Sequence, residues 1–446
     1  MIYRKITSHL EKMRENGGRY ALLVDGARQV GKTFIIREFA KAHYDVFIEI
    51  NFIKMKGAVE IFENVEDEKD ILVKISALTK RKIEKGRTLV FFDEVQKCPE
   101  AVTYIKFLVE EGTCHYVLSG SLLGVELKNI RSVPVGYMDE VKMYPLDFEE
   151  FVNANGEAPE LLEAARQAWD GRKPLASVFH TRLKKLFRLY LVVGGMPAVV
   201  QKYLDTHDIS QVVAEQRKIL ALYRTDITQY DEKNALRIRA VFDRIPAELN
   251  DRNKRFFASS IQPGMRFESL GDEFLWLKAA GVALAVVNVE EPKLPLKLSE
   301  KPNLFKLFSN DVGLLAAQYM KGIQLRILNG EADINFGSVY ENAVAQELTA
   351  HGFELNYYDS NRHGELDFVL ERECCLLPIE VKSGKHYRRH RALNRVMGDS
   401  SLAVREALIL NDDSLKVEGG LFYAPVYMSM FLKSNPLPDK MIYTIN

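Results

Sequence analysis

The sequence has few cysteines, and their placement is unsuited to disulfide bonds. Only four of the 446 residues are cysteines, namely Cys98, Cys114, Cys374 and Cys375. None of them forms a Cys-x-x-Cys pair, and two adjacent cysteines make a poor disulfide. This pattern argues against a disulfide-stabilised secreted protein and favours a reducing compartment.

Long apolar runs and an excess of charge are also missing. The N-terminal stretch MIYRKITSHLEKMRENGGRY has no apolar leader core, and no uninterrupted apolar run approaches membrane-spanning length. We therefore expect a cytoplasmic protein without a membrane partner. Lys+Arg and Asp+Glu both number 61, so any basic surface for nucleic acid must be local.

What the chain has is the composition of an ordinary globular protein, with 47% hydrophobic and 27% charged residues. Its length suits roughly three domains of typical size. Residues 19–41 read RYALLVDGARQVGKTFIIREFAK. A short apolar run there precedes Gly-x-x-x-x-Gly-Lys-Thr at 26–33, and a helical apolar pattern follows, which predicts a phosphate-binding P-loop between a strand and a helix.

The P-loop spacing has a chemical reason. Glycines let backbone N–H groups turn inward around phosphates, and the helix N-terminus adds partial positive charge. Lys32 is predicted to reach the β- and γ-phosphates of ATP, and Thr33 to offer a hydroxyl to Mg²⁺. The nucleotide-binding segment is expected to comprise Gly26, Ala27, Arg28, Gln29, Val30, Gly31, Lys32, Thr33 and Phe34.

Two further strands are expected to complete the nucleotide site. GRTLVFFDEVQ (86–96) predicts a buried strand ending in Asp93 and Glu94. Asp93 would hold Mg²⁺ and Glu94 would orient or deprotonate the attacking water, so Lys32 and Glu94 are the catalytic candidates for hydrolysis. HYVLSGS (115–121) ends in Ser119 and Ser121; either hydroxyl could sense the γ-phosphate, and a simple turn is an equal alternative.

The ordered motifs GARQVGKT, FFDEVQ, LSGS and YPLDFEEF resemble the AAA-type ATPase domain of a large prokaryotic family. Its members carry a C-terminal domain of unknown function that is similar to restriction-endonuclease-type folds. Later stretches match too: YLVVGGMP, LYRTDITQY, FKLFSNDVGLL and GSVYENAVAQEL. Many members have a Gly-Arg pair before the YPL motif, but here Tyr137 follows Gly136 and Arg131 is out of register, which leaves a trans-acting arginine and a homo-oligomer open.

The resemblance implies an α/β multidomain protein with four segments. These are an AAA-type P-loop ATPase domain with a parallel sheet (1–146), a helical lid (147–230), a winged-helix-like segment (231–300) and a PD-(D/E)XK nuclease-like α/β domain (301–446). The proline- and lysine-rich run at 290–303 is expected to be a domain boundary. Arg224 could face the nucleotide or the solvent, and Arg252, Lys254 and Arg255 could meet phosphates or form a solvated helix face.

The stretch GELDFVLERECCLLPIEVKSGK (364–385) is predicted to form a hairpin with one polar face. Alternation places Asp367 on the face opposite Leu366 and Phe368, and Glu380 shares one face with Lys382. From these residues alone, an amphipathic hairpin and a metal site are equally good interpretations.

The neighbouring elements favour the metal site. The predicted order of helix, three strands, helix and strand resembles the PD-(D/E)XK nuclease core, which implies that Glu341, Asp367 and Glu380 hold Mg²⁺ or Mn²⁺ and that Glu380 and Lys382 are catalytic. Carboxylates about 5 Å apart repel by roughly 3 kcal/mol at an effective dielectric of about 20, so they need a cation. Hard oxygen ligands select Mg²⁺ or Mn²⁺.

A basic stretch lies directly after the hairpin and predicts contacts to a phosphodiester backbone. Its cations are Lys385, Arg388, Arg389, Arg391 and Arg395. The sequence therefore predicts an ATP-binding and ATP-hydrolysing protein whose nucleotide state controls a DNA-acting, Mg²⁺- or Mn²⁺-dependent endonuclease-like domain. The alternatives are a nucleotide-gated DNA-binding module or a protein-interaction module, neither of which has nuclease activity.

Overall fold

The computed structural model describes residues 2–121, 136–230, 234–251, 254–261, 263–265, 270–319, 322–331, 337–372, 374–384, 388–402 and 404–434. The N-terminal part is built on a five-stranded sheet whose strand order is β2-β3-β4-β1-β5. The strands are β1 (Ala21–Asp25), β2 (Val46–Asn51), β3 (Thr88–Asp93), β4 (His115–Gly120) and β5 (Met138–Lys142). Every pairing in it is parallel.

Helices cover both faces of this parallel sheet, as its continuous apolar strands require. The helices are α1 (Thr7–Glu15), α2 (Lys32–His43), α3 (Glu68–Thr79) and α4 (Pro99–Glu111). Alternate residues of β3 face opposite sides: Phe91 packs in the cluster with α1 and α2, and Phe92 packs with α3 and α4. This three-layer α/β arrangement is typical of P-loop ATPases and confirms the predicted parallel sheet.

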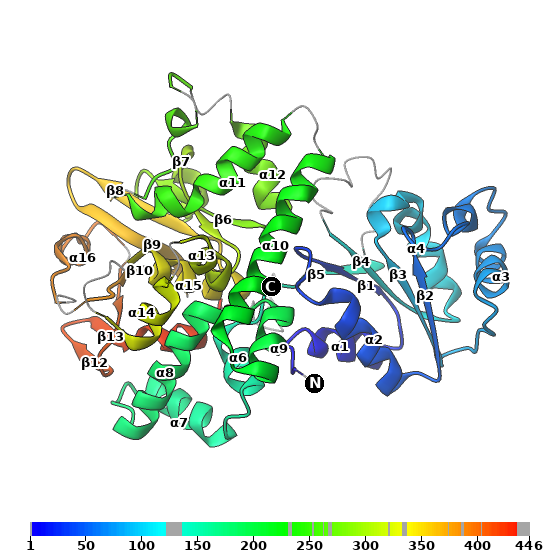
Figure 1. Cartoon of the computed structure of the whole chain (residues 1–446), viewed down its shortest axis with the longest axis horizontal. Helices are drawn as coiled ribbons and strands as arrows, with labels where there is room; N and C mark the ends of the chain where they lie inside the picture. Colours follow the sequence, from blue (N-terminus) through cyan, green and yellow to red (C-terminus); the bar gives the residue numbers. More distant parts are fainter. Residues whose placement is uncertain are drawn as a thin grey trace, which may run out of the picture.

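A helical segment follows the first sheet. It comprises α6 (Phe148–Ala154), α7 (Pro159–Asp170), α8 (Ser177–Val193), α9 (Pro197–Thr206), α10 (Ile209–Tyr230), α11 (Ala235–Asn250) and α12 (Gly271–Ala279). In Figure 1 the long helix α10 runs between the N-terminal sheet on the right and the second sheet on the left. Short 3-10 helices are η1 (Val59–Phe62), η2 (Val95–Lys97), η4 (Ala258–Ser260), η6 (Leu296–Ser299) and η7 (Val426–Phe431).

The second sheet is mixed and has eight strands in the order β12-β13-β11-β10-β9-β8-β6-β7. Its strands are β6 (Ala283–Val289), β7 (Glu300–Ser309), β8 (Asn356–Ser360), β9 (Gly364–Arg372), β10 (Cys375–Val381), β11 (Ala407–Asn411), β12 (Lys416–Glu418) and β13 (Leu421–Pro425). The accompanying helices are α13 (Val312–Gln318), α14 (Ile323–Asn329), α15 (Gly337–Ala350) and α16 (Arg391–Met397). The predicted order of helix, three strands, helix and strand is therefore present from α15 to β11.

The connection at 290–303 differs from the expected domain boundary. It joins β6 to β7, and these strands pair with each other antiparallel while β6 also pairs parallel with β8. A division at residue 300 would cut through this sheet. Pro302 is compatible with the sheet because it lies in β7, an edge strand where a missing N–H donor is tolerated, and Pro292 and Pro295 lie in the connection before that strand.

Two glycine motifs pack against each other where the helical segment meets the second sheet. Gly194 has a φ of +74°, and the N–H of Gly195 donates to Asp311 Oδ2 at 2.6 Å. A Cβ on Gly195 would lie 2.0 Å from the Leu146 carbonyl oxygen, and one on Gly313 would lie 2.4 Å from another backbone carbonyl. The motifs VVGGMP and SNDVG therefore supply a close backbone approach that larger residues would prevent.

One hydrophobic cluster runs through this contact, from α1 and α2 through α8 and α10 to α15 and β10. The helical segment is therefore continuous with both sheets. Among the residues that the structure describes, no helix combines the length and apolar character that crossing a membrane would need.

Candidate nucleotide-binding site and carboxylate cluster

The P-loop connects β1 to α2 through a strained backbone turn. Gly26 has a φ of +152°, and a Cβ there would lie 2.2 Å from the Met143 carbonyl oxygen. Gln29 and Gly31 have φ values of +69° and +95°. Positive φ is cheap for glycine, so the two glycines of the motif let the loop turn immediately before Lys32 opens α2.

Lys32 lies at the centre of the loop. It is 8% exposed, and its Nζ donates to the carbonyl oxygens of Gly26 at 2.6 Å and Ala27 at 2.9 Å. Burial lowers the pKa of Lys32 to about 8, although Glu94 and Asp93 attract the charged form. A bound polyphosphate would supply the negative charge that this buried ammonium lacks.

Asp93 is held at the carboxyl end of β3 by three side chains. Asn51 Nδ2 donates to Asp93 Oδ2 at 2.8 Å, Ser119 Oγ donates to Oδ1 at 2.5 Å, and Thr33 Oγ1 lies 3.3 Å from both oxygens. Thr33 and Asp93 therefore meet where the motif predicts a magnesium site. Ser119 is fully buried behind Asp93, so in this structure it positions the carboxylate, and Ser121 is the serine of this strand end that lines the cavity.

Glu94 lies beyond the end of β3 in a left-handed backbone conformation, with a φ of +59°. This conformation is uncommon outside glycine, and the Glu94 side chain lines the same cavity as the P-loop. Gln96 Nε2 donates to Glu94 Oε2 at 2.5 Å, and Ser121 Oγ lies 3.4 Å from the same oxygen. Gln96 and Ser121 therefore orient the carboxylate that the sequence assigns to the attacking water.

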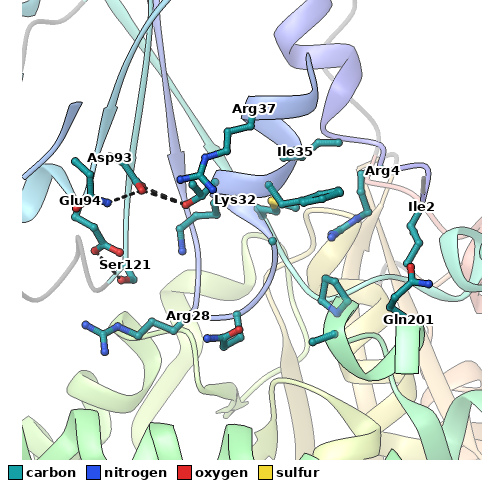
Figure 2. Close-up of a pocket in the computed structure, with 18 of the residues that line it drawn as sticks. Ile2, Arg4, Arg28, Lys32, Ile35, Arg37, Asp93, Glu94, Ser121 and Gln201 are labelled. Carbon is teal, nitrogen blue, oxygen red and sulfur yellow. Dashed lines mark hydrogen bonds between the residues drawn. The ribbon is translucent and has the colours of Figure 1, made fainter. Parts of the chain in front are cut away.

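These residues open onto a cavity of about 780 Å³. Figure 2 shows Asp93, Glu94 and Ser121 at one end and Ile2, Arg4 and Gln201 at the other. Of the predicted nucleotide contacts, the cavity is lined by Arg28, Gln29, Gly31, Lys32, Thr33, Phe34, Asp93 and Glu94. The cavity lining does not include Gly26, Ala27, Val30 or Ser119.

Sequence reasoning missed Arg4, which lies at the far end of the cavity. Its guanidinium donates from Nη1 to the Val30 carbonyl at 3.0 Å, from Nη2 to the Tyr144 carbonyl at 2.6 Å and from Nε to Glu150 Oε2 at 3.1 Å. Arg4 is 7% exposed. The N-terminal segment therefore fixes the P-loop against the YPLDFEEF motif, and the only sequence signal for Glu150 was that motif.

The loop also contacts α10, through Asp226 and not through Arg224. Arg28 Nη1 forms an ion pair with Asp226, and Tyr223 OH donates to the Arg28 carbonyl at 3.1 Å. Arg224 instead pairs with Asp243 of α11 at 2.7 Å and lines a different cavity. The expectation that Arg224 could face the nucleotide is therefore wrong in this structure, because its neighbour two positions along occupies that face. Arg131 lies outside the described residues.

The predicted carboxylate cluster is formed by α15, β9 and β10. Glu341, Asp367 and Lys382 line one cavity of about 390 Å³, and Glu380 lies beside it in contact with Lys382. Glu341 and Glu380 are 2% and 7% exposed, and the Oε2 atom of each has no hydrogen-bond partner. Burial first, and repulsion from Asp367 second, raise the pKa of each of these two glutamates to about 7.

Lysines occupy the positions next to these acids. Lys382 Nζ lies 2.5 Å from Glu380 Oε1, and Lys254, which has a φ of +50°, forms an ion pair with Glu341. Although burial lowers the pKa of Lys382, attraction by Glu380 and Asp367 outweighs it and the pKa is raised. Glu341, Asp367 and Glu380 do not place one oxygen each within 4.8 Å of one another in this structure.

Lys254 and Arg255 were expected to meet phosphates or to be solvated, and both expectations fail for the same reason. Lys254 is paired with Glu341, and Arg255 forms an ion pair with Asp359 of β8. Their partners lie 87 and 104 residues away in the sequence, so no local pattern could identify them. Arg252 lies outside the described residues.

The basic stretch after the hairpin is exposed. Arg388, Arg389, Arg391 and Arg395 all lie on the surface at or before α16, and Arg389 also lines the cavity with Glu341 and Asp367. Lys385 lies outside the described residues. Positive charge is therefore present at the rim of the carboxylate cavity.

The comparisons with known proteins agree with this geometry at the N-terminal end. The family model described as "AAA domain" matches residues 18–152. Two models, each described as a domain of unknown function, match residues 184–325 (DUF8612) and 336–425 (DUF4143). No curated protein matches the chain.

Solved structures of similar proteins include the Walker-type ATPase PABY2304 of Pyrococcus abyssi, with 16% identity and a TM-score of 0.42, covering 72% of this chain and 96% of that one. Another is the Aeropyrum pernix Orc1 protein in complex with DNA, with 12% identity and a TM-score of 0.29, covering 73% and 95%. Residues 18–152 therefore match the AAA domain model, and their described part has the P-loop, the acid pair on β3 and the parallel sheet that are typical of P-loop ATPases.

Proposed function

We propose that this protein binds ATP with Mg²⁺ in the cavity of the P-loop and hydrolyses it. The observation that carries the proposal is the arrangement of Lys32, Thr33, Asp93 and Glu94 along one wall of that cavity. Thr33 Oγ1 and the Asp93 carboxylate, 3.3 Å apart, are the hard oxygen donors that would hold Mg²⁺. The bound ion would neutralise charge on the phosphates.

The residues of the chain supply the remaining steps. Lys32 would exchange its two backbone carbonyl partners for phosphate oxygens, because a charged acceptor forms the stronger hydrogen bond. Glu94, oriented by Gln96 and Ser121, would accept a proton from the attacking water. A carboxylate at this position supports hydrolysis in addition to binding.

We propose further that the carboxylate cluster binds a divalent cation, Mg²⁺ or Mn²⁺, and acts on DNA as an endonuclease-like centre. The supporting observation is a pair of buried glutamates, Glu341 and Glu380, whose pKa values are raised by burial and by the neighbouring Asp367. The unpartnered Oε2 atoms of two buried glutamates are strong acceptors, and a cation is the natural partner for them.

The route that we propose for nucleotide control of this cluster runs through α10 and α11. Arg28 of the P-loop pairs with Asp226 on α10, and Arg224 on the same helix pairs with Asp243 on α11. Lys254, four residues after the end of α11, pairs with Glu341. Phosphates that draw Arg28 away from Asp226 would shift this chain of ion pairs and release Glu341 from Lys254.

A second candidate, a nucleotide-gated DNA-binding or interaction module that cuts nothing, is favoured by one observation. The ammonium groups of Lys254 and Lys382 already neutralise Glu341 and Glu380, and the three acids do not converge on one point. In that case the lysines replace the cation permanently. A homo-oligomer stays a prediction under either candidate.

Cation-dependent cleavage separates the two candidates. Supercoiled plasmid is incubated with the protein and Mn²⁺, with and without ATP, and nicking is followed on gels. We expect nicking by the wild type, none by Glu380→Gln, and an unchanged ATPase rate in that variant because Glu380 lies outside the P-loop cavity. Wild-type nicking no greater than that of Glu380→Gln would favour the second candidate.

DNA binding has its own test. Replacing Arg389, Arg391 and Arg395 by alanine should weaken duplex binding equally for all sequences, because exposed arginines contact phosphates. Three lost contacts should reduce the slope of log affinity against log salt by about 2.7. An unchanged slope would mean that this surface does not bind DNA, whatever the ATPase does.

A further inference from the structure

Away from both sites, a histidine and two acids meet in the interior. Asp147 is the N-cap residue of α6, Glu347 lies in the last turn of α15, and His351 directly follows the end of that helix, four residues after Glu347. The three side chains are only 5%, 2% and 4% exposed. One ligand atom from each residue lies within 4.8 Å of the others, which no other group of three histidines, cysteines or acids achieves in the described part of the chain.

The orientation of the histidine points its free nitrogen into the cluster. His351 Nδ1 lies 2.6 Å from the Leu432 carbonyl oxygen, which can only accept, so Nδ1 carries the proton and donates. Nε2 faces Asp147 Oδ2 at 3.4 Å and Glu347 Oε1 at 3.6 Å. In the neutral imidazole, a lone pair would therefore face two carboxylate oxygens with nothing between them.

Neither separation is a formed hydrogen bond. His351 Nε2 and Glu347 Oε1 are both buried and both lack a hydrogen-bond partner. Ligands about 2.1 Å from a tetrahedral ion lie roughly 3.4 Å from one another, so these separations suit atoms that share one ion. A histidine whose Nδ1–H is held by a carbonyl, leaving Nε2 free, has the orientation that metal-ligating histidines adopt.

Lys5 is the competing cation. Its Nζ lies 2.5 Å from Asp147 Oδ2 and 2.6 Å from Glu149 Oε2. Its side chain is 33% exposed, so it can turn toward solvent while keeping Glu149. A cavity of about 180 Å³ lined by Lys5, Asp147 and Ala350 reaches the cluster and gives an ion a path of entry.

We propose that Asp147, Glu347 and His351 bind a Zn²⁺-like divalent transition metal ion that fastens α6 to α15. One imidazole and two carboxylates form a donor set that suits such an ion. The fourth position is left to water from the adjoining cavity. Because Asp147 belongs to the segment next to the nucleotide cavity and α15 also carries Glu341, the ion joins the two halves of the molecule. This proposal does not depend on either activity proposed above.

The test uses the full chain with Cys374→Ser and Cys375→Ser, since these cysteines, one exposed and one partly exposed, are the obvious competing metal ligands. Metal-free protein is titrated with Co²⁺, whose visible absorption reports tetrahedral coordination, and Zn²⁺ is then added to displace it. We expect one Co²⁺ per chain with the strong visible absorption of tetrahedral coordination, which separates it from Co²⁺ held in octahedral geometry by the oxygen ligands of the carboxylate cluster. His351→Gln and Glu347→Gln should each lower the affinity at least tenfold, since each removes one ligand, while His43→Gln, at an exposed histidine of α2, should not change it.

Lys5→Met should have the opposite effect to the ligand variants: it should tighten Co²⁺ binding because it removes the competing ammonium group. The thermal unfolding midpoint provides a readout that needs no spectrum: Zn²⁺ should raise it in the wild type and leave it unchanged in His351→Gln. Wild-type protein that binds no more Co²⁺ than His351→Gln would overturn the proposal and leave a protonated histidine bridging the two acids. Unchanged or weaker binding by Lys5→Met would also contradict the site described.

Discussion

Replacing Glu341 by glutamine should stabilise the protein at high pH, although it removes an ion-pair partner. The pKa of Glu341 is raised from 4.5 to about 7 even with Lys254 beside it. At pH values between 4.5 and about 7, the Glu341 carboxyl group is therefore protonated in the folded state and ionised in the unfolded chain. Ionising Glu341 costs the folded state about 3 kcal/mol once the pH exceeds 7, at about 1.4 kcal/mol per pKa unit, and costs little below pH 4.5.

Glutamine has the shape of the protonated acid and cannot ionise, so Glu341→Gln avoids this cost. We expect the free energy of unfolding to rise by about 3 kcal/mol at pH 8 and by less than about 1 kcal/mol at pH 5. Urea unfolding at the two pH values measures the difference, with Glu354→Gln, at an exposed glutamate, as the control. Equal effects at both pH values would refute the burial argument. Mn²⁺ should raise the free energy of unfolding of the wild type but not that of Glu341→Gln.

Three further predictions concern the N-terminal half. Lys32→Ala should abolish ATP binding in a nucleotide titration, whereas Glu94→Gln should bind ATP and release phosphate at least about 100-fold more slowly; a wild-type rate would exclude Glu94 from the reaction. Arg4→Met should weaken ATP binding and lower the thermal midpoint, since it leaves the carbonyl and carboxylate acceptors of a buried guanidinium unpaired, and an unchanged affinity would show that Arg4 does not shape the cavity. Gly195→Ala should cost at least about 2 kcal/mol of stability, because its Cβ would lie 2.0 Å from a carbonyl oxygen, and calorimetry showing no loss would contradict that contact.

The P-loop and the acid pair at the end of β3 could be located from the sequence because their patterns are local. The P-loop residues follow one another, and Asp93 and Glu94 end a strand that its apolar pattern identifies. Parallel strands meet at their carboxyl ends, so the two motifs had to meet as well. The hairpin was predictable for the same reason, and β9 and β10 do pair antiparallel, but strict alternation fails at one point: Leu366 and Phe368, predicted on one face, pack into different hydrophobic clusters.

What the sequence could not provide are contacts between distant residues. Arg4 reaches Glu150, 146 positions away, and Arg28 reaches Asp226, 198 positions away. From the sequence, Lys254 could be identified only as one charged residue in a short polar stretch. Which acid a lysine meets depends on how helices and sheets pack, and periodicity carries no information about that packing. The run at 290–303 suggested a domain boundary because prolines suit the connection between two strands of one sheet, and the start of an edge strand, as well as they suit an interdomain linker.

The central claim is that the nucleotide state controls the carboxylate cluster, and counting bound Mn²⁺ tests it most directly. Glu94→Gln is saturated with Mg²⁺ and ATP, and Mn²⁺ binding is followed by electron paramagnetic resonance of the free ion. The same titration is repeated with Glu94→Gln in the absence of nucleotide. It is also repeated with the double variant Glu94→Gln/Glu380→Gln in the presence of ATP. We predict one extra Mn²⁺ with ATP, bound more tightly than without it, and its loss in Glu94→Gln/Glu380→Gln. Equal Mn²⁺ binding with and without ATP would contradict the account.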